Sequence, residues 1–397
     1  MLNPLLDDLT DYPFQRLREL LYGLEPGQPP LVMSIGEPKI SPPAFIDAII
    51  AGAREDWGRY PPMNGTPELN SAIADWLTRR YDLPNGMIDP DRHILPVSGT
   101  REGLYMVGQL TVPPAGDGPR PAVLFPNPFY QAYVGAGVMA GAQVVPVTAG
   151  PATGFLPDYA ALDPALLART RAAFICSPAN PQGVVAGLDY LKAMIKLARA
   201  HRFVLVSDEC YSEIYYDAPP PGLLQACAEL GEGLDGVLVF NSLSKRSGCP
   251  GLRSGFVAGD PVLIKAFGRL RAYGGAALPG PVMAASAALW CDEAHVKESL
   301  ELYRSNMQVA EDILSGTFGF TRPAGGFFLW LDVGDGEATA RALWAKAGLR
   351  VLPGAYLARP NGAGVNPGRA YIRVALVHDR ETTAKALQRL KETLAGS

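Results

Sequence analysis

The sequence predicts an α/β protein in which a mostly parallel sheet is flanked by helices and is followed by a smaller α+β domain. From Ile94 onward, short β-branched or apolar segments alternate with helix-length segments, and this rhythm changes near Pro281. Strand–helix–strand repetition specifies parallel strands covered by helices. Segments that are apolar throughout are typical of strands buried on both faces.

The elements follow one another clearly along the chain. Thr66 can cap the free amides of a helix and Pro67 suits its first position, so a helix is expected to about Tyr81. Helix-length segments such as LDYLKAMIKLARAH separate the expected strands ILPVS, AVLFP, AAFICS, FVLVSDE, GVLVFNS and GFVAG. After Pro281 come two long helical stretches, the strand GGFFLWLDV, a helix, the strand YIRVAL and a last helix from Asp379.

The chain is too long for one small domain, with 397 residues of which 48% are hydrophobic. We expect a large domain over residues 43–280 and a small domain over residues 281–397. Residues 1–42 hold one helical segment, FQRLRELLYGL, and an irregular apolar stretch. We expect this N-terminal arm to pack with the small domain.

Composition narrows the kinds of partner. The net charge of -4 comes from well-mixed acidic and basic residues, so no basic stripe points to nucleic acid. No apolar run approaches the ~20 residues of a bilayer span, and no targeting signal follows Met1. The five cysteines lack CxxC spacing, and the four histidines are far apart. We expect a cytoplasmic protein with reduced thiols, no metal site, no membrane contact and small-molecule partners.

The segment SLSKRSGCPGLRSG carries the strongest chemical signal. Lys245 directly follows a buried strand and lies among Ser242, Ser244 and several glycines, whereas most loop lysines are solvated surface charges. A lysine that attacks a carbonyl must be largely unprotonated, and burial or a neighbouring cation such as Arg253 promotes that state. The guanidinium of Arg253 also suits a phosphate, to which the serine hydroxyls add donors.

Two other strand ends carry polar side chains. Asp208 ends one strand and Tyr211 follows it, while Asn180 in NPQG follows the strand AAFICS. An acid there can be a helix cap and Asn-Pro can be a simple turn, but a carboxylate also keeps a pyridinium nitrogen protonated. Because parallel strands end at one edge of a sheet, Asn180, Asp208 and Lys245 should converge on one ligand.

A glycine turn after ILPVS gives a candidate anion site. Gly99 ends the strand and Thr100 begins a helix, whose free amides can bind a phosphate, although ordinary strand-to-helix turns look similar. Tyr130 in PNPFYQAY can lay its ring on a planar cofactor or can simply belong to the core.

Together these motifs resemble the fold-type I pyridoxal-phosphate aminotransferases of class I/II, over nearly the whole chain. The motifs, in the order of that family, are GEP, Y…NGTPEL, SGT, PNPFYQAY, NPQG, DECY, SLSK…GLRSG, PAGGFFLW and YIRVAL. The resemblance implies a mostly parallel seven-stranded sheet in an α/β/α layer, pyridoxal 5′-phosphate as cofactor, and a homodimer with shared active sites. Cys249 and Ser254 replace residues that are apolar in much of the family, which bears on the subgroup rather than the mechanism.

The resemblance also implies a role for each residue. Lys245 would hold the cofactor as a Schiff base and, once released by the substrate amine, act as the base at the α-carbon. Asp208 would hold the ring nitrogen, and Tyr211 with Asn180 the phenolic oxygen. The other implied contacts are Tyr130 on the ring; Gly99, Thr100, Arg101, Ser242, Ser244 and Arg253 at the phosphate; Tyr60 of a second subunit at the same phosphate; and Arg373, Gly36 and Asn180 at the substrate.

Within the family, GEPK, NPQG and SLSKRS…PGLRSG resemble succinyldiaminopimelate aminotransferases of lysine biosynthesis. This narrower resemblance implies N-succinyl-LL-diaminopimelate as amino donor and 2-oxoglutarate as acceptor. Lys39, beside Gly36, and Arg101, after the glycine turn, are candidates to bind a distal carboxylate. Either residue can instead be a solvated surface charge.

Other functions remain open at this point. One is an aminotransferase of other specificity, for instance for aspartate or aromatic amino acids, and another is a pyridoxal-phosphate lyase or decarboxylase, since one fold supports several reactions. A carboxylate clamp by Gly36 and Arg373 favours transamination over decarboxylation, but not over β-elimination. A transcription regulator would need a helix-turn-helix domain, which we do not expect because GEP begins at Gly36 and no basic recognition helix is present.

Overall fold

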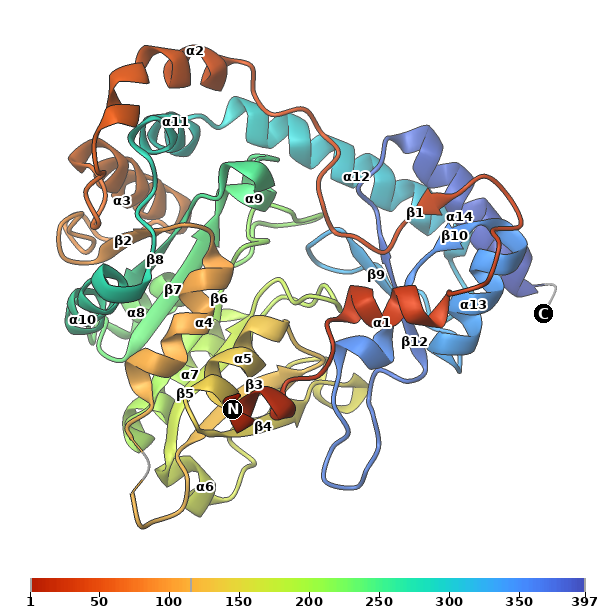
Figure 1. The fold of residues 1–397 in the computed structure, drawn as a ribbon, viewed down its shortest axis with the longest axis horizontal. Helices are drawn as coiled ribbons and strands as arrows, with labels where there is room; N and C mark the ends of the chain where they lie inside the picture. The colour runs from red at the N-terminus through yellow and green to blue at the C-terminus, as the bar shows by residue number, and fades with distance from the viewer. Residues whose placement is uncertain (1, 115, 396–397) are drawn as a thin grey trace.

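The centre of the molecule is a seven-stranded sheet with helices on both faces (Figure 1). The computed structural model describes residues 2–114 and 116–395. The strands, in spatial order, are β2 (Ile94–Val97), β8 (Gly255–Gly259), β7 (Val237–Ser242), β6 (Val204–Asp208), β5 (Thr170–Cys176), β3 (Ala122–Asn127) and β4 (Gln143–Thr148). Of these seven strands, β8 alone runs opposite to the other six, so the predicted mostly parallel seven-stranded sheet is confirmed.

The sheet separates two apolar clusters, because successive strand residues point to opposite faces. In β3, Leu124 packs into one cluster while Val123 and Phe125 pack into the other. The edge strand β4 was not among the expected strands. It is only partly buried and contains Pro146, which is tolerated at a sheet edge.

Helices α3, α7, α8 and α11 cover one face of the sheet, and α4, α5 and α10 cover the other. The helices around this sheet are α2 (Phe45–Gly52), η2 (Arg54–Gly58), α3 (Pro67–Tyr81), α4 (Thr100–Thr111), α5 (Gln131–Met139), η3 (Pro151–Thr153), α6 (Pro164–Ala168), α7 (Leu188–His201), α8 (Leu223–Leu230), α9 (Leu243–Arg246), η4 (Pro250–Leu252), α10 (Pro261–Gly274) and α11 (Gly280–Cys291). The predicted start of α3 is confirmed, since the hydroxyl of Thr66 accepts the amide of Leu69 at 3.3 Å.

A second, smaller layer is built on a three-stranded antiparallel sheet of order β11-β12-β9. Its elements are α12 (Ala294–Leu314), β9 (Phe328–Asp332), α13 (Gly336–Ala347), β10 (Leu349–Arg350), β11 (Leu352–Pro353), η5 (Gly354–Leu357), β12 (Tyr371–Ala375) and α14 (Arg380–Ala395). Helix α11 still packs on the large sheet's core, where the Trp290 and Trp76 rings lie 4.7 Å apart. The packing therefore changes between α11 and α12, and the division of the chain into domains at residue 281 stays a prediction.

The N-terminal arm touches both parts of the molecule. Its elements are η1 (Pro4–Asp8), α1 (Pro13–Leu20) and β1 (Leu31–Val32). Leu5 packs against the core of the large sheet, whereas β1 pairs with β10 and α1 lies against β11 and η5 (Figure 1). Within the described residues, no helix combines the length and the apolar character needed to cross a bilayer.

Candidate active site

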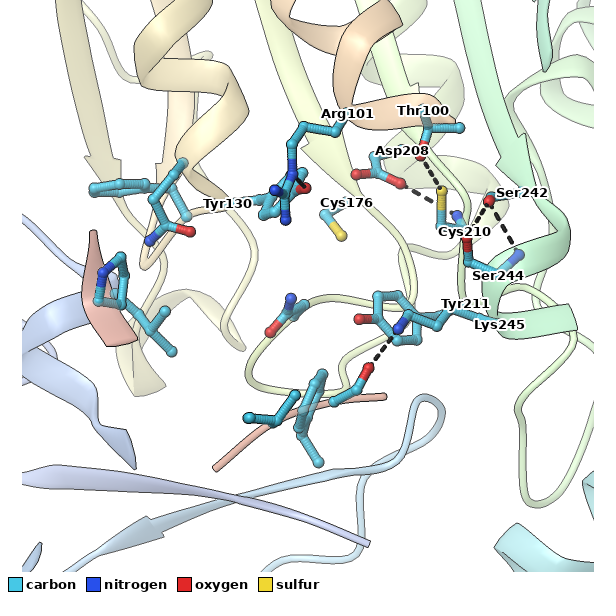
Figure 2. A pocket seen from close by; sticks show the side chains of 18 of the residues that line it. Thr100, Arg101, Tyr130, Cys176, Asp208, Cys210, Tyr211, Ser242, Ser244 and Lys245 are labelled. Atoms are coloured by element: carbon cyan, nitrogen blue, oxygen red, sulfur yellow. Dashed lines mark hydrogen bonds between the residues drawn. The ribbon is translucent and has the colours of Figure 1, made fainter. Parts of the chain in front are cut away.

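A cavity of about 380 Å³ lies where the carboxyl ends of β5, β6 and β7 face the smaller sheet (Figure 2). The parallel strands end together here, as expected for ligand sites in α/β sheets. The predicted residues that line it are Gly36, Thr100, Arg101, Tyr130, Asn180, Asp208, Tyr211, Ser242, Ser244, Lys245, Arg253 and Arg373. The structure thus brings together residues that are far apart in the sequence.

Lys245 projects into this cavity from the one-turn helix α9, which directly follows β7. Its Nζ donates a hydrogen bond to the carbonyl oxygen of Gly36 and lies 5.5 Å from the ring centre of Phe327. Burial, with Arg373 adding to it, lowers the pKa of Lys245 from an ordinary 10.5 to about 8. The expectation that Arg253 would be this cation is wrong, because the cations that lower the pKa are Arg373 and, more weakly, Arg101.

Asp208, at the end of β6, is a buried acid that is 5% exposed. Its Oδ2 accepts the hydroxyl of Tyr133 at 2.7 Å, and its Oδ1 accepts the amide of Cys210 at 3.2 Å. Burial raises the pKa of Asp208, and the two hydrogen bonds oppose that rise. Since an ionised carboxylate has about four acceptor positions, Asp208 retains capacity for a further donor such as a protonated ring nitrogen.

Several donors gather at one end of the cavity. Gly99 is the N-cap of α4 and provides no side-chain cap, so the first amides of α4 remain available to an anion. Gly99 has a φ of 87°, and a Cβ on it would lie 2.0 Å from Nη2 of Arg253, so only glycine fits beside this guanidinium. Ser242 and Ser244 lie nearby, their hydroxyls 3.0 Å apart.

Arg373, on β12, closes the opposite side of the cavity and is 5% exposed. Its Nη1 donates to Oδ1 of Asn180 at 3.0 Å and its Nη2 donates to the carbonyl of Ser34 at 2.8 Å. Burial lowers the pKa of Arg373 to about 10, which leaves it charged at neutral pH. Its buried Nε has no partner among the described residues. Arg373 is therefore a buried cation with donor capacity left for a carboxylate, not a solvent-facing strand residue.

Arg101 lies at the outer part of the cavity between two tyrosines. Its Nε donates to the hydroxyl of Tyr130 at 2.6 Å, and its Nη2 donates to the hydroxyl of Tyr12 at 3.0 Å (Figure 2 shows the first contact). Tyr12 belongs to the N-terminal arm, and Pro13 and Phe14 after it also line the cavity. The arm was expected to contribute Gly36, and the structure adds the segment from Tyr12 to Phe14, which the sequence did not indicate.

Of the predicted residues, Gly99 lies behind Arg253 and does not line this cavity, and Lys39 and Tyr60 lie away from it. Lys39 pairs with Glu37 at 3.0 Å, and its side chain is 49% exposed. Tyr60 is fully exposed, and it contributes nothing to the cavity of the single chain. Their proposed contacts with substrate and with a second subunit's cofactor remain predictions.

The structure adds residues that were not predicted. Tyr133 is fully buried, stacks on Phe174 with the ring centres 4.7 Å apart, and donates to Asp208. It follows Tyr130 by one helical turn in PNPFYQAY, and that spacing was an available signal. Cys210 contacts the hydroxyl of Thr100 at 3.2 Å, and Cys176 lines the same cavity. All five cysteines are free, and the described residues contain no cluster of metal ligands.

These residues fit pyridoxal phosphate. That molecule carries a phosphate, an aldehyde, a ring nitrogen and a phenolic oxygen. The cavity presents Arg253 and free helix amides at one end, the amine of Lys245 with its lowered pKa, the buried acid Asp208 and the hydroxyl of Tyr211. Gly99 lies against the guanidinium of Arg253, at the end of the cavity that suits the phosphate.

Comparison with known proteins agrees with this geometry. The family model described as aminotransferase class I and II matches residues 29–390. A 4-dedimethylamino-4-oxo-anhydrotetracycline transaminase of Streptomyces rimosus is 33% identical over 90% of the chain and 92% of its own length. An LL-diaminopimelate aminotransferase of Desulforudis audaxviator is 31% identical over 98% of the chain and 96% of its own length. The crystal structure of an aminotransferase from Neisseria meningitidis superposes with a TM-score of 0.94 at 43% identity, over 98% of this chain and 99% of that one.

Proposed function

This chain belongs to the class I and II aminotransferases, which use pyridoxal phosphate, and we propose that its amino donor is N-succinyl-LL-diaminopimelate and its acceptor 2-oxoglutarate. Three guanidinium groups line the cavity. The observation that carries the proposal is that Arg373, deep inside, and Arg101, at the outer part, remain for the substrate when Arg253 is assigned to the phosphate. Such a pair suits a substrate with an α-carboxylate and a second, distal acid. The LL-diaminopimelate aminotransferases among the relatives support the diaminopimelate skeleton.

Arg373 binds the α-carboxylate in this proposal. Its guanidinium is held by Asn180 and by the carbonyl of Ser34, and the ring centre of Phe328 lies 4.1 Å from its Cζ. These contacts fix the orientation of the guanidinium before the substrate arrives, so less ordering is needed on binding. The carboxylate then fixes which bonds of the α-carbon face Lys245.

The cofactor would be held by several groups at once. Arg253, the hydroxyls of Ser242 and Ser244, and the amides at the start of α4 would bind its phosphate, while Asp208 would hold its ring nitrogen. Tyr130 would lie on the ring, and Tyr211 would donate to the phenolic oxygen. When bound, the cofactor supplies an acceptor for the electron pair left on the substrate's α-carbon.

Lys245 moves the proton in this proposal. With a pKa near 8, a substantial fraction of its Nζ is neutral at physiological pH, as both attack on a carbonyl and proton removal require. The carbonyl of Gly36 holds that nitrogen inside the cavity. Burial of the surrounding side chains keeps water from competing for the proton.

Arg101 is the residue proposed to read the distal acid. It already donates to two neutral hydroxyls, and a carboxylate is a stronger acceptor than either. Lys39 would reach the site only if its pair with Glu37 opened, so it is the weaker candidate in this structure.

We further propose a homodimer in the cytoplasm, in which Tyr60 of one subunit reaches the phosphate of the other. Its full exposure in the single chain supports this role, as does the exposure of Trp57 nearby in the sequence at 57%.

A panel of donors against 2-oxoglutarate tests the substrate. The panel contains N-succinyl-LL-diaminopimelate, N-acetyl-diaminopimelate, LL-diaminopimelate, glutamate, aspartate and phenylalanine. The highest kcat/KM is expected for the succinylated donor. Preference for LL-diaminopimelate would assign the chain the specificity named for its relatives, and preference for phenylalanine would remove the second acid from the proposal. A half-reaction that leaves pyridoxamine phosphate on the enzyme would distinguish transamination from elimination.

A further inference from the structure

The one-turn helix α9 is too short to fix Lys245 by itself, since a single turn has no stability of its own. Its C-terminal end is anchored by Arg246, whose side chain is buried. Nη1 donates to the carbonyl of Leu289 at 2.6 Å, and Nη2 donates to Glu293 at 2.6 Å and to the carbonyl of Asp292 at 3.2 Å. All three acceptors lie at the junction between α11 and α12, where the small layer begins.

A second anchor runs through the next residue, Ser247, which is 1% exposed. Its hydroxyl lies 2.8 Å from Nε2 of His295, and Nδ1 of His295 lies 2.5 Å from Oδ2 of Asp292. The backbone amide of His295 also donates to the same carboxylate oxygen at 3.1 Å. Ser247, His295 and Asp292 therefore form one hydrogen-bonded chain from α9 to the start of α12.

The direction of donation in this hydrogen-bonded chain is determined by Arg246 at one end, which can only donate, and by Asp292 at the other, which accepts. Nη1 of Arg246 donates to the hydroxyl of Ser247 at 3.4 Å, so that hydroxyl can donate its own proton to Nε2 of His295. Nδ1–H of His295 then donates to Asp292. This arrangement needs a neutral imidazole, and burial, together with the nearby charge of Arg246, lowers the pKa of His295. The hydroxyl of Ser247 and both ring nitrogens of His295 are thus satisfied by one consistent set of donors and acceptors.

The segment after Gly36 packs around the same helix. The carbonyl of Gly36 accepts from Lys245, and Ile40 fills the space beside Gly248, where a Cβ would lie 2.6 Å from its Cγ1. Further along, the ring of Phe45 meets the imidazole of His295 edge-on, with centres 6.2 Å apart. Side-chain packing and the hydrogen-bonded chain thus hold α9 from both sides.

We propose that His295 is a positioning residue for Lys245, because it ties the end of α9 through Ser247 to the start of the small layer. The proposal rests on the proposed function in one respect, that Lys245 is the lysine that carries the reaction. His295 touches neither substrate nor cofactor in this account. It acts by holding the helix that presents the amine.

The same three residue types form the catalytic triad of serine hydrolases, in which the serine is the nucleophile. That reading is disfavoured here, because the oxygen of Ser247 already receives an N–H of a buried cation and is 1% exposed.

Three variants test the proposal, with Glu298→Gln as the control on the exposed side of α12. His295→Phe removes both hydrogen bonds and keeps the aromatic volume, Ser247→Ala removes one oxygen, and His295→Gln keeps an acceptor for Ser247. The first readout is the pH dependence of acetylation of Lys245 in the cofactor-free protein, followed by mass spectrometry. The second is kcat and KM of the complete enzyme.

A loosened α9 admits water to Lys245, so His295→Phe should raise the pH midpoint of acetylation, with about tenfold less neutral amine at pH 8. We expect kcat to fall about tenfold with KM within about twofold, because geometry rather than binding is lost. His295→Gln should restore part of both effects. If His295→Phe does not fold, the same two measurements on Ser247→Ala test the proposal.

The proposal would be overturned if His295→Phe and Ser247→Ala had the same acetylation midpoint and the same kcat as Glu298→Gln. This holds even if their thermal stability falls, because a purely structural role would change only the stability. Failure of the proposed function would look different. Borohydride treatment of the unaltered holoenzyme would then trap no cofactor on Lys245, while the acetylation midpoint would still report whether His295 positions that amine.

Discussion

The inner and outer residues of the cavity are held in different ways. The inner set, Asp208, Lys245 and Arg373, is buried or nearly so, and its side chains bond to backbone groups or to buried side chains. The outer set, Tyr12, Arg101 and Tyr130, is more exposed, and its contacts join one side-chain tip to another. Buried polar contacts are costly to break, whereas exposed ones are readily exchanged with water or ligand.

We infer from this difference that the two sets of residues have different roles. In the proposed function, the inner set contacts the cofactor and the atoms that all amino acid substrates share, so its changes should affect every donor. Arg101 of the outer set would meet the variable end of the substrate, where an exchangeable contact is an advantage. The comparison predicts large, general effects inside and small, selective effects outside.

Replacement of Lys245 tests the inner set most severely. Lys245→Ala should lower turnover about 10⁴-fold for every donor and abolish the visible absorbance of the bound cofactor, because both the covalent amine and the proton carrier are lost. Absorbance spectra and single-turnover assays measure both effects, with Lys196→Ala on the surface of α7 as control. Normal turnover in Lys245→Ala would remove that residue from the reaction.

The titration of Lys245 gives the next largest effect. Because its pKa is lowered from 10.5 to about 8, the neutral fraction near neutral pH should exceed that of an ordinary lysine about 300-fold. The acetylation rate of Lys245 in the cofactor-free protein should therefore rise with pH to a midpoint near 8. A midpoint near 10.5 would show that water reaches the inner set.

Loss of Arg373 should raise KM for all amino donors alike. Arg373→Ala removes a charge-assisted contact to the common α-carboxylate, and we expect KM to rise about 10- to 100-fold as a result. Steady-state kinetics with dicarboxylic and neutral donors measure it. An increase confined to dicarboxylic donors would assign Arg373 to the side chain and reverse the comparison.

The smallest effect is expected in the outer set. Arg101→Gln should raise KM about three- to fivefold for N-succinyl-LL-diaminopimelate, since an exposed ion pair contributes little. A neutral donor such as phenylalanine serves as the internal control and should be unaffected. Equal losses for both donors would mean that Arg101 holds Tyr130 in place rather than reading the substrate.

The same division explains how much could be predicted from the sequence. Asn180, Asp208 and Lys245 each follow an apolar strand, and parallel strands end at one edge, so their convergence followed from the pattern. Arg373 needed the family's motif, because a strand arginine carries no sign of its burial. Tyr12 lies in an irregular arm without periodicity, and nothing local places that arm over the cavity.

Two further features could be found only from the three-dimensional structure. Arg253 is close to Lys245 along the chain, yet η4 carries it toward Gly99 and α4, so Arg373 from the small layer is the cation that affects the lysine. Strand β4 was not predicted from the sequence, because Pro146 interrupts its apolar segment and proline argues against a strand interior.

The connection from β7 to β8 has a consequence for which molecules the cavity accepts. These strands are antiparallel neighbours, with Ser242 opposite Gly255, so the short connection between them starts and ends at fixed points of the sheet. Lys245 and Arg253 both lie on this connection. In the proposed function, this connection limits the distance between the carbon bonded to Lys245 and the phosphate bound by Arg253. Adding or removing a single residue in it should therefore change which length of molecule fits at both ends.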